Sequence, residues 1–366
     1  MIERKVKMTA TPCFTSRLLA LTILFCGLTY PLFAATQTTA PVTTLRIVGG
    51  LATGNRYSKF ERPFWVSELS KLSGGKFTAE IVPFDRAGVP GSDMLRMMQL
   101  GVIPFGTALF SQMAIEAPQF NAPDLAGLNP DMQSVRNAVA AFRPYLEKSL
   151  QERYGVEVLA VYVYPPQVLF CKKPFANLSD LTKRRIRVAN ATQADFIEAL
   201  GAIPFRTEFA DIMNSMNAGN TDCAITAAMA GNTLGLHEIT SHIHSLPMTW
   251  GLSVFAVNVA TWRSLNPELK ALLKRELPKL ERAIWEESEL DAIEGIVCNT
   301  GGAGCTNGRK GRMIAVRTGE SDEQRRKQIF SGTVLPRWVQ RCGVSCTTVW
   351  NQTVRAVVDV APPQPK

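Results

Sequence analysis

Apolar residues recur along the chain with two different periods, and the two periods alternate. Short apolar runs predict strands over 45–48 and 77–82. Between them, the segment 57–72 places four large apolar side chains on one helical face: Phe60, Phe64, Trp65 and Leu69. A strand, a helix and a second strand in this order predict a βαβ unit, and therefore a parallel sheet.

The alternation continues through the middle of the chain. Further elements are predicted as helices over 132–154 and 194–200 and as strands over 156–164, 168–171 and 186–188. Asn190 or Thr192 would cap the helix over 194–200. The pattern indicates an α/β fold, and 366 residues exceed what one compact core usually uses, so two lobes are expected.

One long helix is predicted between Asn266 and Ile293. Asn266 is its expected cap and Pro267 takes the first-turn position, where a missing N–H costs nothing. Pro278 is expected to kink this helix, because its ring removes one backbone hydrogen bond. The apolar residues that recur at helical spacing are Leu269, Leu273, Leu277, Leu280, Ile284 and Leu290.

The N-terminal segment 1–34 has the pattern of a signal peptide. Basic residues precede an apolar run over 18–33, and Ala34 or Ala35 offers a small residue for cleavage. A lipid anchor at Cys26 is disfavoured, because Phe25 is not a small residue. We therefore expect an exported protein.

The net charge of +9 favours anionic ligands. It does not indicate nucleic-acid binding, which usually requires a concentrated basic face and a groove-reading or aromatic module. No such module is visible, so no nucleic-acid partner is expected.

Six cysteines follow the N-terminal segment. In an oxidising compartment the last four, Cys298, Cys305, Cys342 and Cys346, suggest two disulfides, either local or crossed. A zinc site is the rival interpretation, and it is disfavoured because neither pair has the two-residue spacing of common zinc knuckles. Cys171 and Cys223 are expected to remain free thiols.

Four motifs, in their order and spacing, give the chain a family resemblance. They are GSDMLRMMQLGVI, KKPFANLSDLTKRRIRV, LGAIPF and VNVATWRSLNPELKALL. The chain resembles the extracytoplasmic solute-binding subunits of tripartite ATP-independent periplasmic (TRAP) transporters, the DctP-like family, over roughly 45–296.

The resemblance implies a two-lobed periplasmic-binding-protein fold whose long kinked helix spans both lobes. Lobe I would comprise 45–164 with 253–291. Lobe II would comprise 165–252 with 292–350, including the C-terminal disulfide region. Such a receptor works in the periplasm without a cofactor, closing over a small organic anion, usually a carboxylate, and handing it to integral-membrane permease subunits.

Arg187 is the leading ligand-binding candidate. Alternation along the strand places Ile186 and Val188 on one face and Arg187 on the other. Arg187 lies late enough in the strand to reach the crevice beyond its C-terminal end, where open α/β sheets bind ligands. A guanidinium can bind a carboxylate through two parallel hydrogen bonds. The family's ligand-binding arginine also falls on Arg187.

The other candidate ligand-binding residues either differ from the family pattern or are of types that also occur in protein cores. Gln167 stands where many members carry a second arginine, and Thr226 stands near the position of an asparagine in several members. We therefore expect a ligand with one carboxylate and a less polar remainder. Trp250 could form a wall of the pocket, and Tyr164, Phe205 and Phe110 are further aromatic candidates, although each suits an ordinary core position at least as well. Asn258 is a candidate for ligand contact, with a turn or cap role as the alternative.

No catalytic constellation is visible. The segment HEITSH has histidines five residues apart, not the four that place two zinc ligands on one helical face. A GxSxG nucleophile elbow is absent. A binding protein is therefore expected, with a secreted hydrolase or a ligand-sensing receptor on the same scaffold as the alternatives.

Overall fold

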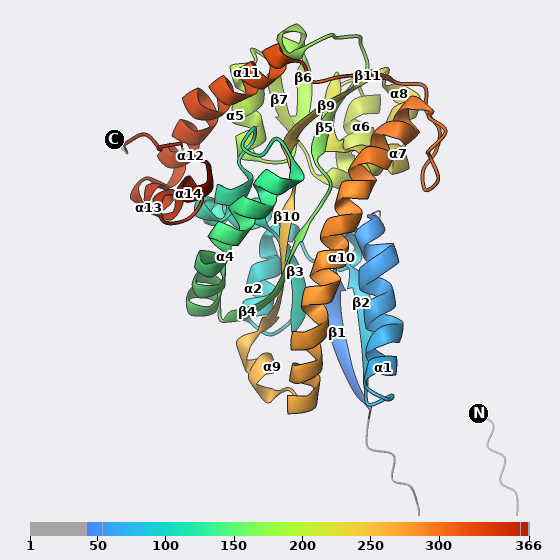
Figure 1. Ribbon diagram of the computed structural model, residues 1–366, viewed down its shortest axis with the longest axis vertical. Coiled ribbons are helices and arrows are strands. Elements are labelled where there is room, and N and C mark those ends of the chain that lie inside the picture. Colours follow the sequence, from blue (N-terminus) through green and yellow to red (C-terminus); the bar gives the residue numbers. More distant parts are fainter. Residues whose placement is uncertain (1–41, 53, 359, 365–366) are drawn as a thin grey trace, which may run out of the picture. The chain divides into compact units, whose positions relative to one another are not determined.

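The computed structural model describes residues 42–52, 54–358 and 360–364, and its strands form two sheets (Figure 1). The predicted signal peptide lies outside the described residues. The first sheet has the strand order β2-β1-β3-β10-β4. Its strands are β1 (Thr43–Gly49), β2 (Phe77–Pro83), β3 (Phe105–Leu109), β4 (Val156–Val163) and β10 (Leu252–Asn258).

The predicted βαβ unit is confirmed at the start of the first sheet. β1 pairs in parallel with β2 and with β3, whereas β10 pairs antiparallel with β3 and β4. The chain between β1 and β2 is helical through η1 (Arg56–Glu61), η2 (Phe64–Glu68) and α1 (Leu69–Leu72). Its apolar face, which includes Phe64, Trp65 and Leu69, is buried against the sheet.

The second sheet has the order β11-β9-β5-β8-β6-β7. β6 pairs in parallel with β7 and β8, β5 pairs antiparallel with β8 and β9, and β11 pairs in parallel with β9. The strands are β5 (Gln167–Cys171), β6 (Arg185–Val188), β7 (Ile203–Arg206), β8 (Cys223–Ala227), β9 (His242–Thr249) and β11 (Ile314–Val316).

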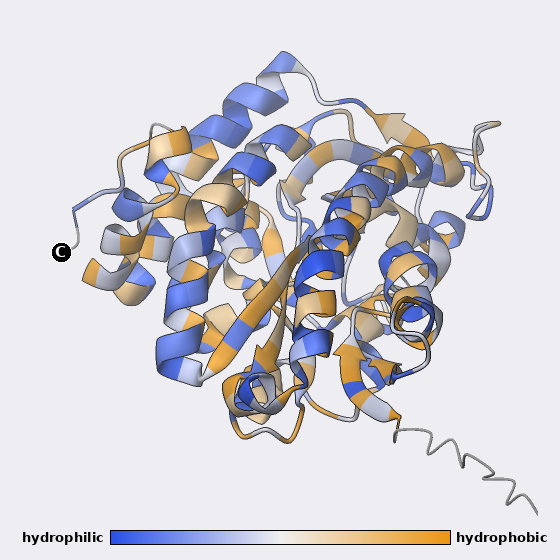
Figure 2. Cartoon of the chain, turned by 60° about the horizontal axis from the view of Figure 1, so that its bottom comes forward, coloured by the Kyte–Doolittle hydropathy of each residue, from blue (hydrophilic) through white to orange (hydrophobic). Residues whose placement is uncertain are grey.

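Helices cover both sheets, and Figure 2 shows apolar colour gathered on the central strands and polar colour on the peripheral helices. Asp131 caps α4 by accepting from Ser134 N at 2.7 Å, and Asn190 caps α5, as predicted. The helices are α2 (Met94–Gln99), α3 (Phe110–Glu116), α4 (Met132–Tyr154), α5 (Ala191–Ala199), α6 (Ile212–Asn217), α7 (Ala228–Leu234), α8 (Leu236–Ile239), α9 (Val259–Ser264), α10 (Pro267–Thr300), α11 (Glu320–Ile329), α12 (Leu335–Cys342), α13 (Val344–Gln352) and α14 (Arg355–Val358).

The long helix α10 packs against elements of both sheets, so the fold is a two-lobed α/β fold (Figure 1). It runs through Pro278 and continues seven residues beyond the predicted end at Ile293. On the side of the first sheet, the Trp285 indole N–H donates to Val161 O at 2.8 Å. On the side of the second sheet, the Asn299 amide donates to Ala228 O at 2.8 Å.

The cysteines form three disulfides, which corrects one prediction. Cys171 and Cys223 are bonded to each other rather than free, because the β5–β8 register places them directly opposite on neighbouring antiparallel strands. This pair spans 52 residues of sequence and gives no local signal. The other disulfides, Cys298–Cys305 and Cys342–Cys346, are the local alternatives that the sequence left open.

The C-terminal helices pack onto the segment η5 (Pro118–Asp124) and onto α4. The Trp338 indole N–H donates to Pro118 O at 2.8 Å, and Trp338 and Trp350 pack edge to face in the core. None of the helices in the described ranges is both long enough and apolar enough to span a bilayer.

Candidate ligand-binding site

Two short segments carry the chain between the sheets. One joins β4 to β5 at 164–166, and the other joins β9 to β10 at 250–251, near the positions that the family resemblance implied. Tyr164 N donates to Gly251 O at 2.8 Å, so the two crossings run side by side. Gly251 has φ 73°, and an added Cβ would lie 3.4 Å from the Tyr164 Cβ. The contact with Tyr164 would be an ordinary van der Waals contact, but a side chain at residue 251 would be strained by the positive φ.

A cavity of about 120 Å³ adjoins these crossings and is lined by residues of both lobes. The first lobe contributes Leu51, Leu109, Ser111, Asp124, Tyr164 and Leu252. The second lobe contributes Gln167, Arg187, Ala189, Asn190, Gln193, Phe209, Thr226, Ala227, Ala230 and Thr249, and Gly251 completes the wall at the crossing. Mostly apolar walls with a few convergent polar groups are typical of small-molecule sites.

Arg187 lies in this cavity, as the alternation along β6 predicts. Its side chain is 3% exposed, and it is held by the two strands next to β6. Its Nε and Nη2 donate to Thr207 O at 3.1 and 2.7 Å, and its Nη1 donates to Ile225 O at 2.8 Å. A guanidinium has five N–H groups, so donors remain for a ligand.

The charge of Arg187 has no carboxylate partner within salt-bridge distance among the described residues. Burial lowers the pKa of Arg187 to about 10, with the charge of Glu208 opposing that shift. The side chain is therefore charged at neutral pH. An uncompensated buried cation gains most from an anion that enters the cavity.

Gln167 and Thr226 are brought together with Arg187, because β5 and β8 are neighbours in the second sheet. Val168 lies opposite Thr226 in the ladder, and Gln167 lies opposite Ala227. Both side chains line the cavity. Neither carries a charge, so Arg187 is the single cation among the lining residues.

Asp124 lines the cavity, and the sequence analysis did not reveal it. Its Oδ1 accepts from Trp250 N and its Oδ2 accepts from Gly251 N, each at 2.8 Å. The residue is 4% exposed, and burial raises the pKa of Asp124 to about 7 against the lowering effect of these two donors. Its partners lie more than 120 residues away, so no local pattern could have identified it.

Gln193 and Thr249 were also missed. The Gln193 Oε1 accepts from Ala189 N at 2.8 Å, and its Nε2 donates to Thr249 Oγ1 at 2.8 Å. This chain of bonds joins α5 to the end of β9 beside the second crossing. A glutamine three positions after the helix cap Asn190 was the only local signal.

Three of the predicted residues lie outside the lining of this cavity. Phe110 is 1% exposed and packs against Phe142, while its neighbours Leu109 and Ser111 line the cavity. The Trp250 indole N–H donates to Asn129 O at 3.1 Å within the core. Asn258 caps α9, accepting from Thr261 N, and its amide donates to Met98 O at 3.0 Å.

The two remaining aromatic candidates divide in the same way. Tyr164 lines the cavity, and its ring lies 4.2 Å from the guanidinium carbon of Arg56. Phe205 is 40% exposed on β7 and does not line the cavity. Arg56 is itself buried and forms an ion pair with Glu61, whose Oε1 lies 3.0 Å from the Arg56 Nε. Glu61 also accepts a hydrogen bond from Gly50 N.

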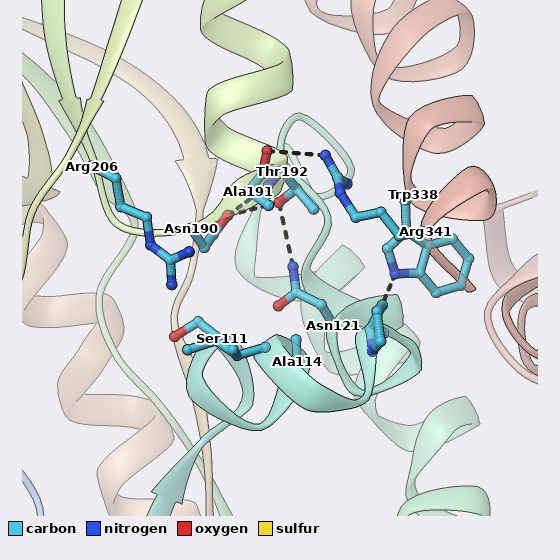
Figure 3. A pocket seen from close by; sticks show the side chains of 11 residues that line it. Ser111, Ala114, Asn121, Asn190, Ala191, Thr192, Arg206, Trp338 and Arg341 are labelled. Carbon is cyan, nitrogen blue, oxygen red and sulfur yellow. Dashed lines mark hydrogen bonds between the residues drawn. The ribbon is translucent and has the colours of Figure 1, made fainter. Parts of the chain in front are cut away.

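A second, larger cavity of about 310 Å³ adjoins the first and shares Ser111 and Asn190 with it. Figure 3 shows Asn190 and Arg206 on one side of this outer cavity and Ser111 and Ala114 on the other. Trp338 and Arg341 of α12 also line it, and Arg341 is ion-paired with Asp195. Arg206 is exposed, so the outer cavity presents a cation at the surface beside the buried one.

In the described part of the chain, no group of three or more His, Cys, Asp or Glu side chains lies close enough together to bind a metal ion. His244 instead binds Asp322 at 3.1 Å and accepts from Leu246 N at 2.9 Å. Because Nδ1 is the acceptor, Nε2 carries the proton that is donated to Asp322. This pair attaches α11 to the second sheet.

Comparison with solved structures shows the same fold in solute receptors. The DctP7 receptor of Bordetella pertussis, described as binding pyroglutamic acid, has a TM-score of 0.73 at 18% identity, covering 86% of this chain and 99% of that one. A TRAP periplasmic solute-binding protein of Desulfovibrio salexigens with bound orotic acid has a TM-score of 0.73 at 13% identity, covering 86% and 99%. A Sulfitobacter protein of the same class with bound β-D-galacturonate has a TM-score of 0.70 at 16% identity, covering 86% and 100%.

No curated protein matches the chain. A family model does match it over residues 57–302, which is most of the chain and includes both crossings and Arg187. That model describes solute-binding receptors, in agreement with the resemblance carried by the four motifs. The chain belongs to family 7 of the bacterial extracellular solute-binding proteins, the DctP family.

Proposed function

We propose that this protein is a periplasmic receptor that captures a small organic acid and delivers it to the membrane subunits of a TRAP-type permease. The observation that carries the proposal is Arg187, a buried cation in a cavity lined by both lobes, with no carboxylate of the described residues within salt-bridge distance. A carboxylate entering the cavity would meet its free donors in charge-assisted hydrogen bonds. Family membership supports the transport role.

The ligand has one carboxylate and a less polar remainder. Gln167 can donate a hydrogen bond but cannot neutralise a second anionic group, and Thr226 is uncharged as well. The apolar side chains Leu51, Leu109 and Leu252 line the same cavity as Arg187. The relatives named above bind pyroglutamic acid, orotic acid and galacturonate, each of which carries a carboxylate.

The protein binds without catalysis, and an N-terminal signal peptide exports it. Capture requires only that the ligand bind the closed arrangement of the lobes more tightly than the open one. The Arg187 carboxylate bond and the apolar walls would contribute to that difference, because both lobes contact the ligand at once.

A thermal-shift screen against mono- and dicarboxylates, including L-pyroglutamate and orotate, tests the proposal. A bound acid should raise the melting temperature by mass action. NMR of the incubated acid should show no product, since turnover would favour the hydrolase alternative. A screen without a single stabilising acid would refute the proposal.

Two arginine variants in strand β6 test whether Arg187 itself binds the ligand. Arg187→Gln should weaken binding of the best acid by at least about a hundredfold, as expected for a charged hydrogen-bonded partner. Arg185→Gln is the matched control, because Arg185 is exposed on the same strand and paired with Asp222 at 3.0 Å. Circular dichroism checks that both variants are folded. Equal affinity in the two variants would remove Arg187 from the site.

A further inference from the structure

Two buried ionisable side chains line the inner cavity, a guanidinium and a carboxyl group, and neither has an ionic partner among the described residues. Within the described part of the chain, Arg187 bonds only to the backbone carbonyls of Thr207 and Ile225 and to the Thr207 hydroxyl. Asp124 accepts only from the backbone N–H groups of Trp250 and Gly251, and no Lys, Arg or His side chain of the described residues bonds to it. The cavity therefore offers a cation on the second lobe and a carboxyl group on the first.

Asp124 has acceptor capacity left after its two backbone bonds. A carboxylate presents about four lone-pair sites on its two oxygens, and each oxygen of Asp124 uses one. The residue is 4% exposed yet lines the cavity, so the ligand space is where its remaining lone pairs can be satisfied. A buried acceptor without a partner costs free energy, and a ligand that supplies a donor removes that cost.

Most other polar side chains of the cavity already use their acceptors. Gln193 bonds through both ends of its amide, and Thr249 accepts from it. The Asn190 Oδ1 accepts from Thr192 N and Gln193 N in the helix cap. Gln167 retains a free carbonyl oxygen, since its Nε2 is the atom that bonds to Pro165 O. The hydroxyl groups of Ser111 and Thr226 also line the cavity, and among the described residues they make no hydrogen bond, so they can accept as well. The acceptors to separate are therefore Asp124, Gln167, Ser111 and Thr226.

We infer that Asp124 accepts a hydrogen bond from the ligand, so that the ligands of this protein carry an N–H or O–H donor in addition to the carboxylate bound by Arg187. This inference rests on the proposed function. It names the ligand class as small carboxylic acids that also carry an amide, imide, amine or hydroxyl proton. A plain alkanoic acid would leave Asp124 unpaired in a closed cavity.

The consequence is strong discrimination against ligands without the donor. A site built around a buried polar group rejects analogues that lack its partner far more strongly than an apolar pocket rejects a missing methylene. We expect at least about a tenfold loss of affinity when the donor is removed, since a buried unpaired acceptor costs that much or more.

Matched ligand pairs test this in the unaltered protein by calorimetry. L-pyroglutamate is compared with 5-oxotetrahydrofuran-2-carboxylate, in which a ring oxygen replaces the N–H. 2-Hydroxy-3-methylbutanoate is compared with 3-methylbutanoate, which lacks the hydroxyl. The donor-bearing member should bind at least about tenfold more tightly in every pair that binds. Affinities within about twofold in those pairs would overturn the inference while leaving the proposed function intact.

Variants assign the preference to one acceptor. Asp124→Ala should reduce the preference within a pair to below about threefold. Gln167→Met, Ser111→Ala and Thr226→Val should each retain it. A preference lost in one of these three instead would assign the donor to that residue and overturn the inference. If Asp124→Ala does not fold, because the second crossing loses two bonds, Gln167→Met, Ser111→Ala and Thr226→Val still decide, since a preference retained in all three leaves Asp124 as its source. If no carboxylate in the pairs or the wider screen binds, the proposed function itself is wrong, and the inference falls with it.

Discussion

The disulfide between Cys171 and Cys223 should be the strongest covalent contribution to stability in this chain. In the chain-entropy description, a disulfide stabilises by restricting the unfolded state, more so for longer loops. The two cysteines are separated by 52 residues, whereas Cys342 and Cys346 are separated by four. The relation gives about 4 kcal/mol for the long loop and about 2 kcal/mol for the short one at 25 °C.

The perturbation is the double variant Cys171→Ala/Cys223→Ala, with Cys342→Ala/Cys346→Ala as the matched control. Urea unfolding followed by tryptophan fluorescence gives the free energy of unfolding for each. The first variant should lose about 2 kcal/mol more than the control. Loss of the two sulfurs from fully buried positions adds to the cost of the first variant, because Cys171 and Cys223 are both 0% exposed.

Two results would refute this reasoning. Equal losses in the two double variants would show that loop length does not govern the effect here. Thiol titration of the denatured, unreduced protein gives the second check, since the cysteines from Cys171 to Cys346 should contribute no free thiol. Two thiols lost on substituting Cys171 and Cys223 would return these residues to the unpaired state that the sequence first suggested.

Two further predictions concern packing and pH. Gly295→Ala should destabilise the protein by about 1–2 kcal/mol in thermal unfolding, because overpacking outweighs the gain in helix propensity. An added Cβ at residue 295 would lie 2.4 Å from Met229 N. In the control variant Gly332→Ala the added Cβ meets no atom within 4 Å, so this variant should be neutral or stabilising in the same assay. Equal melting temperatures for these two variants would contradict the close approach of α10 and α7. Because the pKa of Asp124 is raised to about 7, its contribution to stability is fully present below the unfolded value of 3.8 and is lost as pH rises through 7. The unligated protein should therefore lose stability relative to Asp124→Ala between about pH 4 and pH 7 in urea titrations, and parallel curves for the two proteins would contradict the raised pKa.

Local patterns were sufficient for the elements and for the position of Arg187 at the cavity. The strands and helices of the βαβ unit follow from the spacing of apolar residues, and the caps at Asn190 and Asn266 follow from side chains that bond to backbone two or three residues away. Arg187 follows from strand alternation together with the rule that ligands bind beyond the C-terminal ends of parallel strands. Each of these depends on neighbours in sequence.

The rest of the site depends on contacts that cross the fold. Asp124 reaches Trp250 and Gly251 from a different lobe, and the Cys171–Cys223 bond depends on the register of two strands 52 residues apart. Phe110 shows the other limit. An aromatic residue suits a ligand wall and a core equally well, and the turn into α3 directs Phe110 to Phe142 while Leu109 and Ser111 face the cavity.

A crystal structure of the protein with the tightest-binding acid from the screen tests the central claim most directly. The account predicts a ligand carboxylate in the inner cavity, with its oxygens about 3 Å from the guanidinium nitrogens of Arg187. A carboxylate bound at Arg206 in the outer cavity, with Arg187 still bonded only to Thr207 and Ile225, would contradict it.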